Sequence, residues 1–423
     1  MDRIKRERFC TVLSFFDVMH TKKILVDVLV LPGIRRMMQY IDYNSDRRKS
    51  MEIPKAEGEK NIRGSREAFT EDIGTNISLI EKRIRDGALT QEKWVLGRRT
   101  KTEAVLLYLE GVAYGKILEQ VRTKLRVPDI DSVMDGGMLE QLMKENVWSP
   151  FPQCQASERP DRTAQALLEG RAAILLDHSP EALILPATVN SMFQTGDDYY
   201  RHFMVVSFLR LIRYLAAFLA AFLPGLYVAA SCYHTQLLPT NLILSLAEAR
   251  AGVPFPVLLE VLLMELAFEL IREAGLRMPG AIGNTIGIVG GLIIGQSAVS
   301  ANLVSPMTVV VVALTALGSF SVPNEEFSEA LRLIKYVNVF LGGALGIVGI
   351  ALGGYFLALH LTRLQSFGVP YLNPFAMPEV NDAYDLRDSL LRWPMRTLQR
   401  RPLFAWHRQR VRMRQKEGDN ARK

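Results

Sequence analysis

Cysteine and histidine are scarce in this sequence, and their scarcity excludes several classes of protein. The 423 residues include 3 cysteines and 6 histidines. Cys10, Cys154 and Cys232 are far apart and form no Cys-x-x-Cys pair, so we expect neither a disulfide framework nor a zinc site. The histidines have no His-Glu-x-x-His spacing, and no Gly-x-Ser-x-Gly turn is present. We therefore expect no catalysis, no metal and no cofactor.

The glycine-rich stretch from Gly283 to Leu317 lacks the spacing of a phosphate-binding loop. No glycine in it is followed by another two positions later, and no Lys-Ser/Thr pair follows. Instead, glycines recur every four residues at Gly283, Gly287, Gly291 and Gly295. On a helix this spacing puts them on one stripe, where the missing side chains let another backbone approach. The pattern indicates helix packing inside a membrane.

The N-terminus lacks the features of a secretory signal. Its basic start is followed by a short apolar run that meets Asp17 and His20, and no small-residue cleavage site follows. We therefore expect the first large domain to stay in the cytoplasm. The apolar run at 24–34 predicts a buried strand that ends at Pro32-Gly33.

Charge and hydropathy divide the chain into four segments. Residues 1–63 form an N-terminal segment, 64–203 a mixed, charged domain, 204–361 a mostly apolar region and 362–423 a polar tail. The part from Arg387 to Lys423 carries a dozen Lys or Arg residues against few acids. A basic segment beside a membrane span is more simply an anchor near anionic lipid than a nucleic-acid site. We expect membrane lipid, and no nucleic acid, as the partner of this tail.

The charged domain shows the patterns of an α+β fold. Ile73, Ile77, Ile80 and Ile84 have the spacing of an amphipathic helix. Residues 92–111 predict two strands around an exposed turn at Arg98-Arg99, with binding of an anion or of a partner's acids as the alternative. A helix is expected over 112–127. Two apolar runs around Asp177–Pro180 predict a hairpin. The topology of the sheet stays open.

The apolar region contains four candidate membrane spans, at 209–231, 282–303, 306–322 and 337–361. The first of them is long enough for a hydrocarbon core of roughly 30 Å. Glycines at helical spacing recur in the last of them, at Gly342, Gly346, Gly349 and Gly353. Four spans return the chain to its starting side, so both termini are expected in the cytoplasm. The fold class is thus an α+β cytoplasmic domain, a polytopic α-helical membrane domain of about four to six segments, and a basic cytoplasmic tail.

The segment 254–273 is apolar but carries acids at Glu260, Glu265 and Glu269. A carboxylate at bilayer depth costs about 2.5–3.5 kcal/mol on insertion scales, so such groups face water or a partner. One interpretation is a cation path or proton site. The other is an interfacial or re-entrant helix whose acids lie in water or pair with nearby arginines, namely Arg250, Arg272 or Arg277. An enzyme that uses Glu265 and Glu269 as an acid/base pair ranks last.

Polar residues also interrupt the second candidate span. Asn284, Gln296 and Ser300 could line a wet path together with the three glutamates. They could equally join helices through hydrogen bonds worth about 0.6 kcal/mol each. The candidate ion path therefore comprises six residues, and the alternatives stay open from the residues alone.

Several stretches together resemble the A-subunit family of spore germinant receptors (the GerA type), which includes the stage V sporulation protein AF. The resemblance covers roughly residues 57–378, in the same order and spacing that the family shows. It is carried by the stretches GSREAFTEDIGTNISLIEKRIR, LGRRTKTEAVLLYLEG, NVWSPFPQCQASERPDRTAQALLEGRAAILLD, ARAGVPFPVLLEVLLMELAFELIREAGLRMP and IGNTIGIVGGLIIGQSAVSANLVSPMTVVVVALTAL.

The resemblance implies a multi-pass protein of the spore inner membrane. It implies a transporter-like B subunit and a lipoprotein C subunit as partners, and a homo-oligomeric ring that opens as an ion channel when nutrient germinants bind. The related sporulation protein is expected to amplify ion release. A membrane scaffold that only positions its partners is the alternative. Family members begin with another α/β subdomain, so residues 1–63 are expected to be a diverged or truncated segment.

Overall fold

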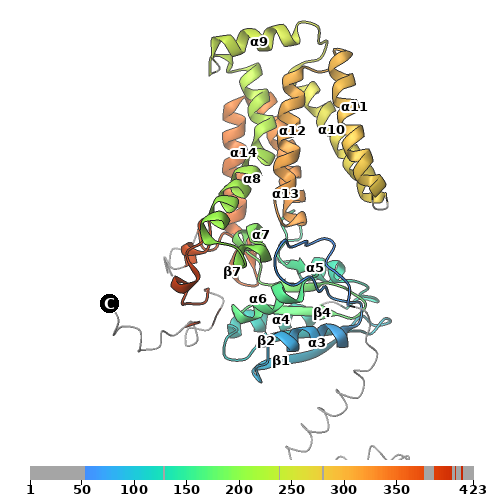
Figure 1. Cartoon of the computed structure of the whole chain (residues 1–423), viewed down its shortest axis with the longest axis vertical. Helices are drawn as coiled ribbons and strands as arrows, with labels where there is room; N and C mark the ends of the chain where they lie inside the picture. Colours follow the sequence, from blue (N-terminus) through green and yellow to red (C-terminus); the bar gives the residue numbers. More distant parts are fainter. Residues whose placement is uncertain are drawn as a thin grey trace, which may run out of the picture. The chain divides into compact units, whose positions relative to one another are not determined.

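The computed structural model describes residues 53–126, 129–237, 239–278, 281–375, 385–402, 405 and 411–412, with the backbone alone at 242 and 281–289. The described residues from Pro54 onward belong to one compact unit. Figure 1 shows this unit as a sheet with helices around it, joined to a set of longer helices. The strand predicted at 24–34 lies outside the described residues.

An antiparallel sheet of five strands, in the order β1-β2-β4-β5-β3, forms the centre of the first domain. Its strands are β1 (Leu89–Leu96), β2 (Thr102–Leu109), β3 (Gln155–Ser157), β4 (Ala172–Leu176) and β5 (Ala182–Leu185). β1 and β2 meet at the predicted Arg98-Arg99 turn, and β4 and β5 form the predicted hairpin. Both predictions are confirmed. β4 and β5 are buried along their whole length because helices cover both faces of the sheet.

Alternate residues of β2 point into two separate cores, as the period of two along a strand requires. Ala104, Leu106 and Tyr108 contact one core, formed with α4 (Gly115–Arg126) and α5 (Gly136–Met143). Val105, Leu107 and Leu109 contact the other, formed with α3 (Ile73–Arg83) and α6 (Pro160–Leu168). The isoleucine spacing that predicted α3 therefore marks the face buried on the sheet, and the helix predicted over 112–127 is α4.

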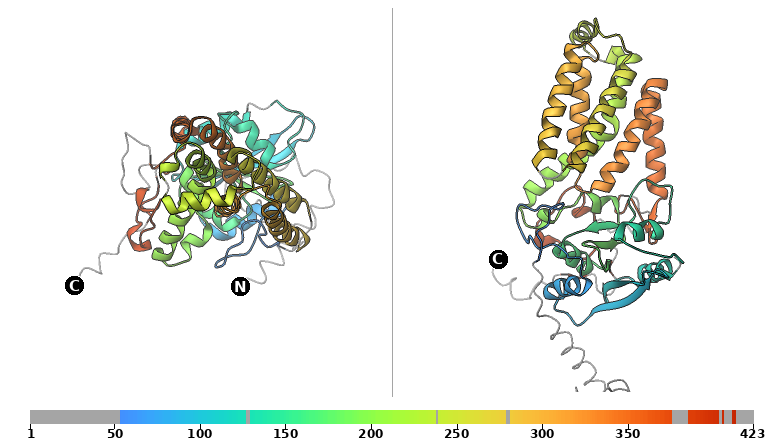
Figure 2. Two further views of the ribbon diagram at one scale, coloured as in Figure 1. Left: turned by 90° about the horizontal axis from the view of Figure 1, so that it is seen from above. Right: turned by 90° about the vertical axis from the view of Figure 1, so that its right-hand side faces the viewer.

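The second domain is helical from residue 203 to residue 363. Short elements α7 (Val189–Phe193) and η2 (Gly196–Tyr199) lead into it. Its helices are α8 (Phe203–Cys232), α9 (Thr240–Arg250), α10 (Val257–Arg277), α11 (Ala281–Ser300), α12 (Pro306–Phe320), α13 (Glu325–Leu345) and α14 (Ile347–Arg363). α8 packs mainly on α12 and α13, whereas α11 packs mainly on α10. α9 lies crosswise at the end farthest from the sheet (Figures 1 and 2).

Among the described residues, one helix is long and apolar enough to cross a membrane. This helix is α8, with 30 residues and a mean hydropathy of 1.9 over its most apolar window. α12 and α14 are apolar but shorter. α8 contains the predicted span 209–231, and the spans expected at 282–303 and 306–322 stay predictions.

The single span predicted over 337–361 is wrong, because the chain reverses inside it. α13 ends at Leu345 and α14 begins at Ile347, and the two helices pack against each other. Gly346 between them has φ +63°, a conformation that glycine adopts without steric cost. Gly346 is therefore not part of a helical packing stripe. Its spacing from Gly342 and Gly349 matches a continuous helix, and the sequence pattern alone does not reveal the turn.

The chain returns to the first domain after α14. A short hairpin of β6 (Gln365–Ser366) and β7 (Val369–Pro370) follows the helix. The Ser366 hydroxyl donates to the Gln153 carbonyl oxygen at 2.6 Å and accepts from the Ala187 amide at 3.0 Å. The helical domain is therefore attached to the first domain at its end as well as at its start. Much of the predicted basic tail lies outside the described residues.

A buried ionic cluster as the candidate functional site

The helix α10 carries the three acids that the sequence singled out. It begins after Pro256, a residue that suits a helix start because its φ is fixed and no amide hydrogen is lost. Glu260 lies in its first turn and Arg277 in its last, so both charges complement the helix dipole. The segment 254–273 is thus largely one regular helix.

Glu265 and Glu269 face α13 and form a cluster with two cations on it. The Lys335 ammonium group donates to Glu265 at 2.6 Å and lies 3.6 Å from Glu269. Arg332 donates to Glu269 at 2.9 Å. Glu265 is 2% exposed and Lys335 is 4% exposed. Two acids four residues apart on α10 therefore meet two cations three residues apart on α13, and the four charges cancel.

Glu260 lies in a second buried site, at the start of α12. Its carboxylate accepts from the Ser305 amide at 3.0 Å and from the Thr308 hydroxyl at 3.1 Å, and it is fully buried. Arg250, at the end of α9, lies 3.3 Å from the other carboxylate oxygen. The acid thus occupies the positive end of the α12 dipole and ties three helices together.

These contacts agree only partly with the expected arginine partners. The pairing of Arg250 with Glu260 was one of the alternatives, and Arg277 pairs with Glu273 on its own helix. The partners of Glu265 and Glu269 were missed. Arg332 and Lys335 lie just before an apolar run, which is the signal that could have identified them.

The other candidate path residues lie elsewhere. Gln296 and Ser300 are exposed on α11, and the side chain of Asn284 lies outside the described residues. The hydrogen bonds and ion pairs of these acids are with residues of α9, α12 and α13, and none involves a described side chain of α11. Within one chain, the described candidates therefore form two groups: buried, paired acids and exposed polar residues on α11.

The two glycine stripes differ in their surroundings. A Cβ on Gly342 would lie 2.6 Å from the Gly225 carbonyl oxygen of α8, and Cβ atoms on Gly349 and Gly353 would overlap Leu341 and Asn338 of α13. In contrast, a Cβ on Gly291 would meet no described atom within 4 Å. One on Gly295 would lie 3.5 Å from Val309, an ordinary contact. The surroundings of Gly283 and Gly287 lie outside the described side chains. At Gly291, the stripe therefore leaves a gap in this chain's own packing.

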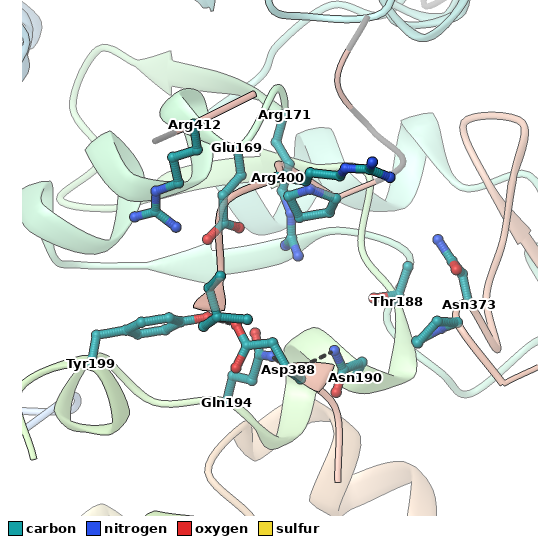
Figure 3. A pocket seen from close by; sticks show the side chains of 13 residues that line it. Glu169, Arg171, Thr188, Asn190, Gln194, Tyr199, Asn373, Asp388, Arg400 and Arg412 are labelled. Atoms are coloured by element: carbon teal, nitrogen blue, oxygen red, sulfur yellow. Dashed lines mark hydrogen bonds between the residues drawn. The ribbon is translucent and has the colours of Figure 1, made fainter. Parts of the chain in front are cut away.

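A polar cavity of about 60 Å³ lies between the first domain and the C-terminal segment. Figure 3 shows Glu169, Arg171 and Arg412 on one side of it and Tyr199, Gln194 and Asp388 on the other. Burial raises the pKa of Glu169 and lowers the pKa of Arg171, and the attraction between the two charges opposes both effects. The side chains that line the cavity carry charges of both signs, so the cavity suits the polar groups of a ligand or a few water molecules. Among the described residues, no group of three or more His, Cys, Asp or Glu side chains could hold a metal ion.

The start of α8 is joined to this region by a buried ionic network. The Arg210 side chain is fully buried and donates to Asp198 at 3.0 Å and to Asp388 at 2.9 Å. Arg213 donates to Asp198 at 2.9 Å. Burial raises the pKa of Asp198, but the hydrogen bonds and charges of the two arginines outweigh it and hold this pKa below its usual value. The network links η2, α8 and the C-terminal segment.

The Arg98-Arg99 turn is exposed, as predicted, and has partners within its own domain. Arg98 lies 3.3 Å from Asp129 and 3.0 Å from Asp131, and Arg99 lies 3.8 Å from Asp131. Acids of the same chain therefore already occupy the sites where a ligand's anion would bind.

Fold and site define a class: an α/β domain joined to an apolar helical domain that holds its buried charges in pairs. Comparisons give the family. Residues 19–404 match the family model described as Bacillus/Clostridium GerA spore germination protein, and the chain belongs to this family. The match begins earlier and ends later than the stretch of roughly 57–378 indicated by the motifs.

Relatives at about 40% identity agree with this assignment. Spore germination protein A1 of Bacillus subtilis (strain 168) is 39% identical, over 83% of this chain and 72% of the relative. The uncharacterized membrane protein YfkQ of the same organism is 40% identical, over 86% of this chain and 70% of the relative. The N-terminal domain of the A subunit of the Bacillus megaterium spore germinant receptor GerK3 is 43% identical, over 28% of this chain and 93% of that chain, with a TM-score of 0.24.

Proposed function

We propose that this chain is a membrane subunit of a spore germination complex and forms an oligomeric ion channel that releases cations in response to nutrient germinants. It would cross the spore inner membrane several times with both termini in the cytoplasm. Its partners would be a transporter-like B subunit and a lipoprotein C subunit. Membership of the germination family supports the proposed role in spore germination. The arrangement of polar groups in the helical domain supports the proposed ion channel.

The observation that carries the proposal is the contrast between α10 and α11. Glu260 and Glu265 are buried with hydrogen-bond donors or a cation, and the half-buried Glu269 lies beside Arg332 and Lys335, so these three acids are neutralised inside the subunit. Gln296 and Ser300 are exposed on a helix that packs mainly on α10. In an oligomer, this face of α11 would line the path, while Glu260, Glu265 and Glu269 would hold the helices that carry it. Asn284 belongs to the same helix but lies about 120° around its axis from Gln296, so it stays a separate candidate.

Potassium release tests this assignment. Gln296→Leu and Ser300→Leu should each alter the flux from cells that express the chain with its genomic neighbours, without loss of membrane insertion. Ile294→Ala is the matched control, because residue 294 lies on nearly the opposite side of α11 from residue 296. Unchanged flux in both polar variants would exclude this face of α11 as the path.

A scaffold without conduction is the second candidate, and the open space at Gly291 favours it. A glycine whose added Cβ would meet no described atom of its own chain within 4 Å, as at Gly291, suits contact with a second subunit or a partner. In a scaffold, Gly291→Leu should disrupt assembly while the Gln296 and Ser300 substitutions have no effect. A third outcome is that this chain releases no ions alone but increases the release through another channel in the same cell. That result would assign the chain the amplifying role of the sporulation paralogue.

A further inference from the structure

The loop between α5 and β3 exposes two large apolar side chains. Trp148 is 95% exposed and its neighbour Val147 is 72% exposed. Tryptophan is a large apolar side chain with a single polar N–H group, and it is enriched where one end meets an apolar phase and the other meets water. An almost fully exposed tryptophan beside an exposed valine therefore points to a surface that something covers.

The loop is held in this position by a clamp at its base. The Gln153 side-chain oxygen accepts from the Glu145 amide at 2.6 Å and from the Asn146 amide at 3.4 Å. Its amide group donates to the Asn146 carbonyl oxygen at 3.0 Å. Three hydrogen bonds from one buried side chain thus fix the two ends of the loop, so the exposure of Trp148 is built into the fold.

The residues after Trp148 attach the loop to the end of α14. The Ser149 hydroxyl lies 2.8 Å from Nε2 of His360, a residue of the last turn of α14. Phe151 is fully buried and its ring lies 5.5 Å from that of Phe327 and 6.0 Å from that of His360. The direct neighbour of Trp148 therefore contacts the last turn of this apolar helix, which places the two side by side.

The outer surface of α14 is apolar up to that turn. Its large exposed side chains are Val348, Leu352, Tyr355 and Phe356. The helix ends at Arg363, also exposed. An apolar helix face that ends in a basic residue is typical of a lipid-facing surface that ends at the cytoplasmic side of a membrane. The exposed loop is thus continuous with a surface suited to lipid.

We propose that Val147 and Trp148 insert into the headgroup region of the bilayer at the end of α14 and so anchor the first domain to the membrane. The indole ring would lie among the upper acyl chains, with its N–H group toward water or headgroup oxygens. This inference rests on the proposed membrane function. It assigns the α/β domain a lipid contact of its own.

The experiment uses the full chain reconstituted in phosphatidylcholine–phosphatidylglycerol vesicles, with Trp94, Trp393 and Trp406 replaced by Phe so that Trp148 is the sole tryptophan. Bromine on the lipid acyl chains quenches an indole that contacts them. We expect bromine near the headgroups to remove most of the Trp148 fluorescence, bromine near the chain ends to remove little, and acrylamide in the buffer to have a small effect. A matched variant that keeps Trp94 alone should be unaffected by either lipid.

Trp148 fluorescence that acrylamide removes and bromine does not would overturn the proposal. Fluorescence that resists both quenchers would also overturn it, because a second copy or another protein would then cover the loop. Resistance of the chain to alkaline extraction is measured in parallel. An inserted chain with an unquenched Trp148 rejects the lipid anchor alone, whereas an extracted chain rejects the membrane function itself. If the triple variant fails to fold, the difference between the unaltered chain and Trp148→Ser gives the same reading.

Discussion

The ammonium group of Lys335 on α13 donates to the carboxylate of Glu265 on α10 at 2.6 Å, and both side chains are almost fully buried. The pair lies where two apolar helices meet. Taking two charges out of water is costly, and their attraction offsets that cost only while both are present. This pair therefore fixes how α10 sits against α13, and through α10 it also positions α11.

Removal of one partner should destabilise the helical domain. Lys335→Met leaves Glu265 buried without its cation, and we expect a loss of about 3–5 kcal/mol in the free energy of unfolding. The double variant Glu265→Leu, Lys335→Met should recover most of this loss, because no unpaired charge remains. Denaturant unfolding of the detergent-solubilised protein measures both.

The control for this pair is Arg277→Met, which breaks an exposed pair with Glu273 on the same helix. Exposed pairs are worth about 0–1 kcal/mol, so this variant should stay close to the unaltered chain. Equal losses in Lys335→Met and Arg277→Met would contradict a special role for the buried pair.

Glycine-to-alanine substitutions should separate the two glycine stripes. A Cβ on Gly342 would lie 2.6 Å from the Gly225 carbonyl oxygen, so Gly342→Ala must push α8 and α13 apart, at a cost of about 1–3 kcal/mol. Gly291→Ala adds its methyl group to open space and should be neutral, or stabilising by up to about 1 kcal/mol, since alanine favours a helix. Thermal unfolding of the two variants side by side provides the measurement. A stable Gly342→Ala protein would show that the helices are not in contact there.

A larger side chain at Gly291 should affect contacts between chains and leave the single chain intact. Gly291→Leu places a branched side chain where no described atom of this chain lies within 4 Å of the added Cβ. We expect an unchanged unfolding midpoint and a reduced yield of cross-linked oligomer in the membrane. Oligomers that form as before would show that the stripe faces lipid.

Stability should fall as pH rises, because two acids lie together where α5 meets α13. Glu140 is buried and lies 3.2 Å from Lys144. Glu326, in the first turn of α13, is close enough to Glu140 for the two acids to interact. Burial, followed by repulsion from Glu140, raises the pKa of Glu326 to about 7 from an ordinary value of 4.5.

The sign of the pH effect follows from this shift. The folded chain holds the proton more tightly than the unfolded chain, so the contribution is complete below pH 4.5 and is lost as pH rises through about 7. The loss should be on the order of 1–3 kcal/mol. Glu326→Gln resembles the protonated form and should flatten the decline in unfolding temperature over this interval. An unchanged decline would assign it to other groups.

Local patterns predicted the first domain well because its elements are short. The residues that indicate each element all lie within that element. The isoleucines of α3 and the turn at Asp177–Pro180 each lie within one helix or one hairpin. Gly346 shows the limit of such patterns. A reversal between two apolar helices depends on packing against α8, and the local spacing of glycines matches a straight helix equally well.

The site shows the same limit. Apolar surroundings and charge identified Glu260, Glu265 and Glu269, because a carboxylate in such a segment requires a partner. The partner itself cannot be read from spacing, since Lys335 lies 70 residues away from Glu265 in the chain. Gln296 was grouped with these acids on polarity alone. The structure places it on another helix, α11, where it is exposed and lies away from the cations that pair with the acids of α10.

The attachment of the helical domain at both of its ends limits how it can move. Arg210 holds the start of α8 to Asp198 and Asp388, and Ser366 holds the chain after α14 to Gln153. Swinging of the whole domain about one hinge would break buried bonds at the other end. α10 and α11 contact other helices, and no described hydrogen bond joins them to the sheet domain. α8, α13 and α14 thus form a fixed frame, and α10 is held to the other helices by the buried contacts of Glu260 and Glu265 rather than by the sheet domain.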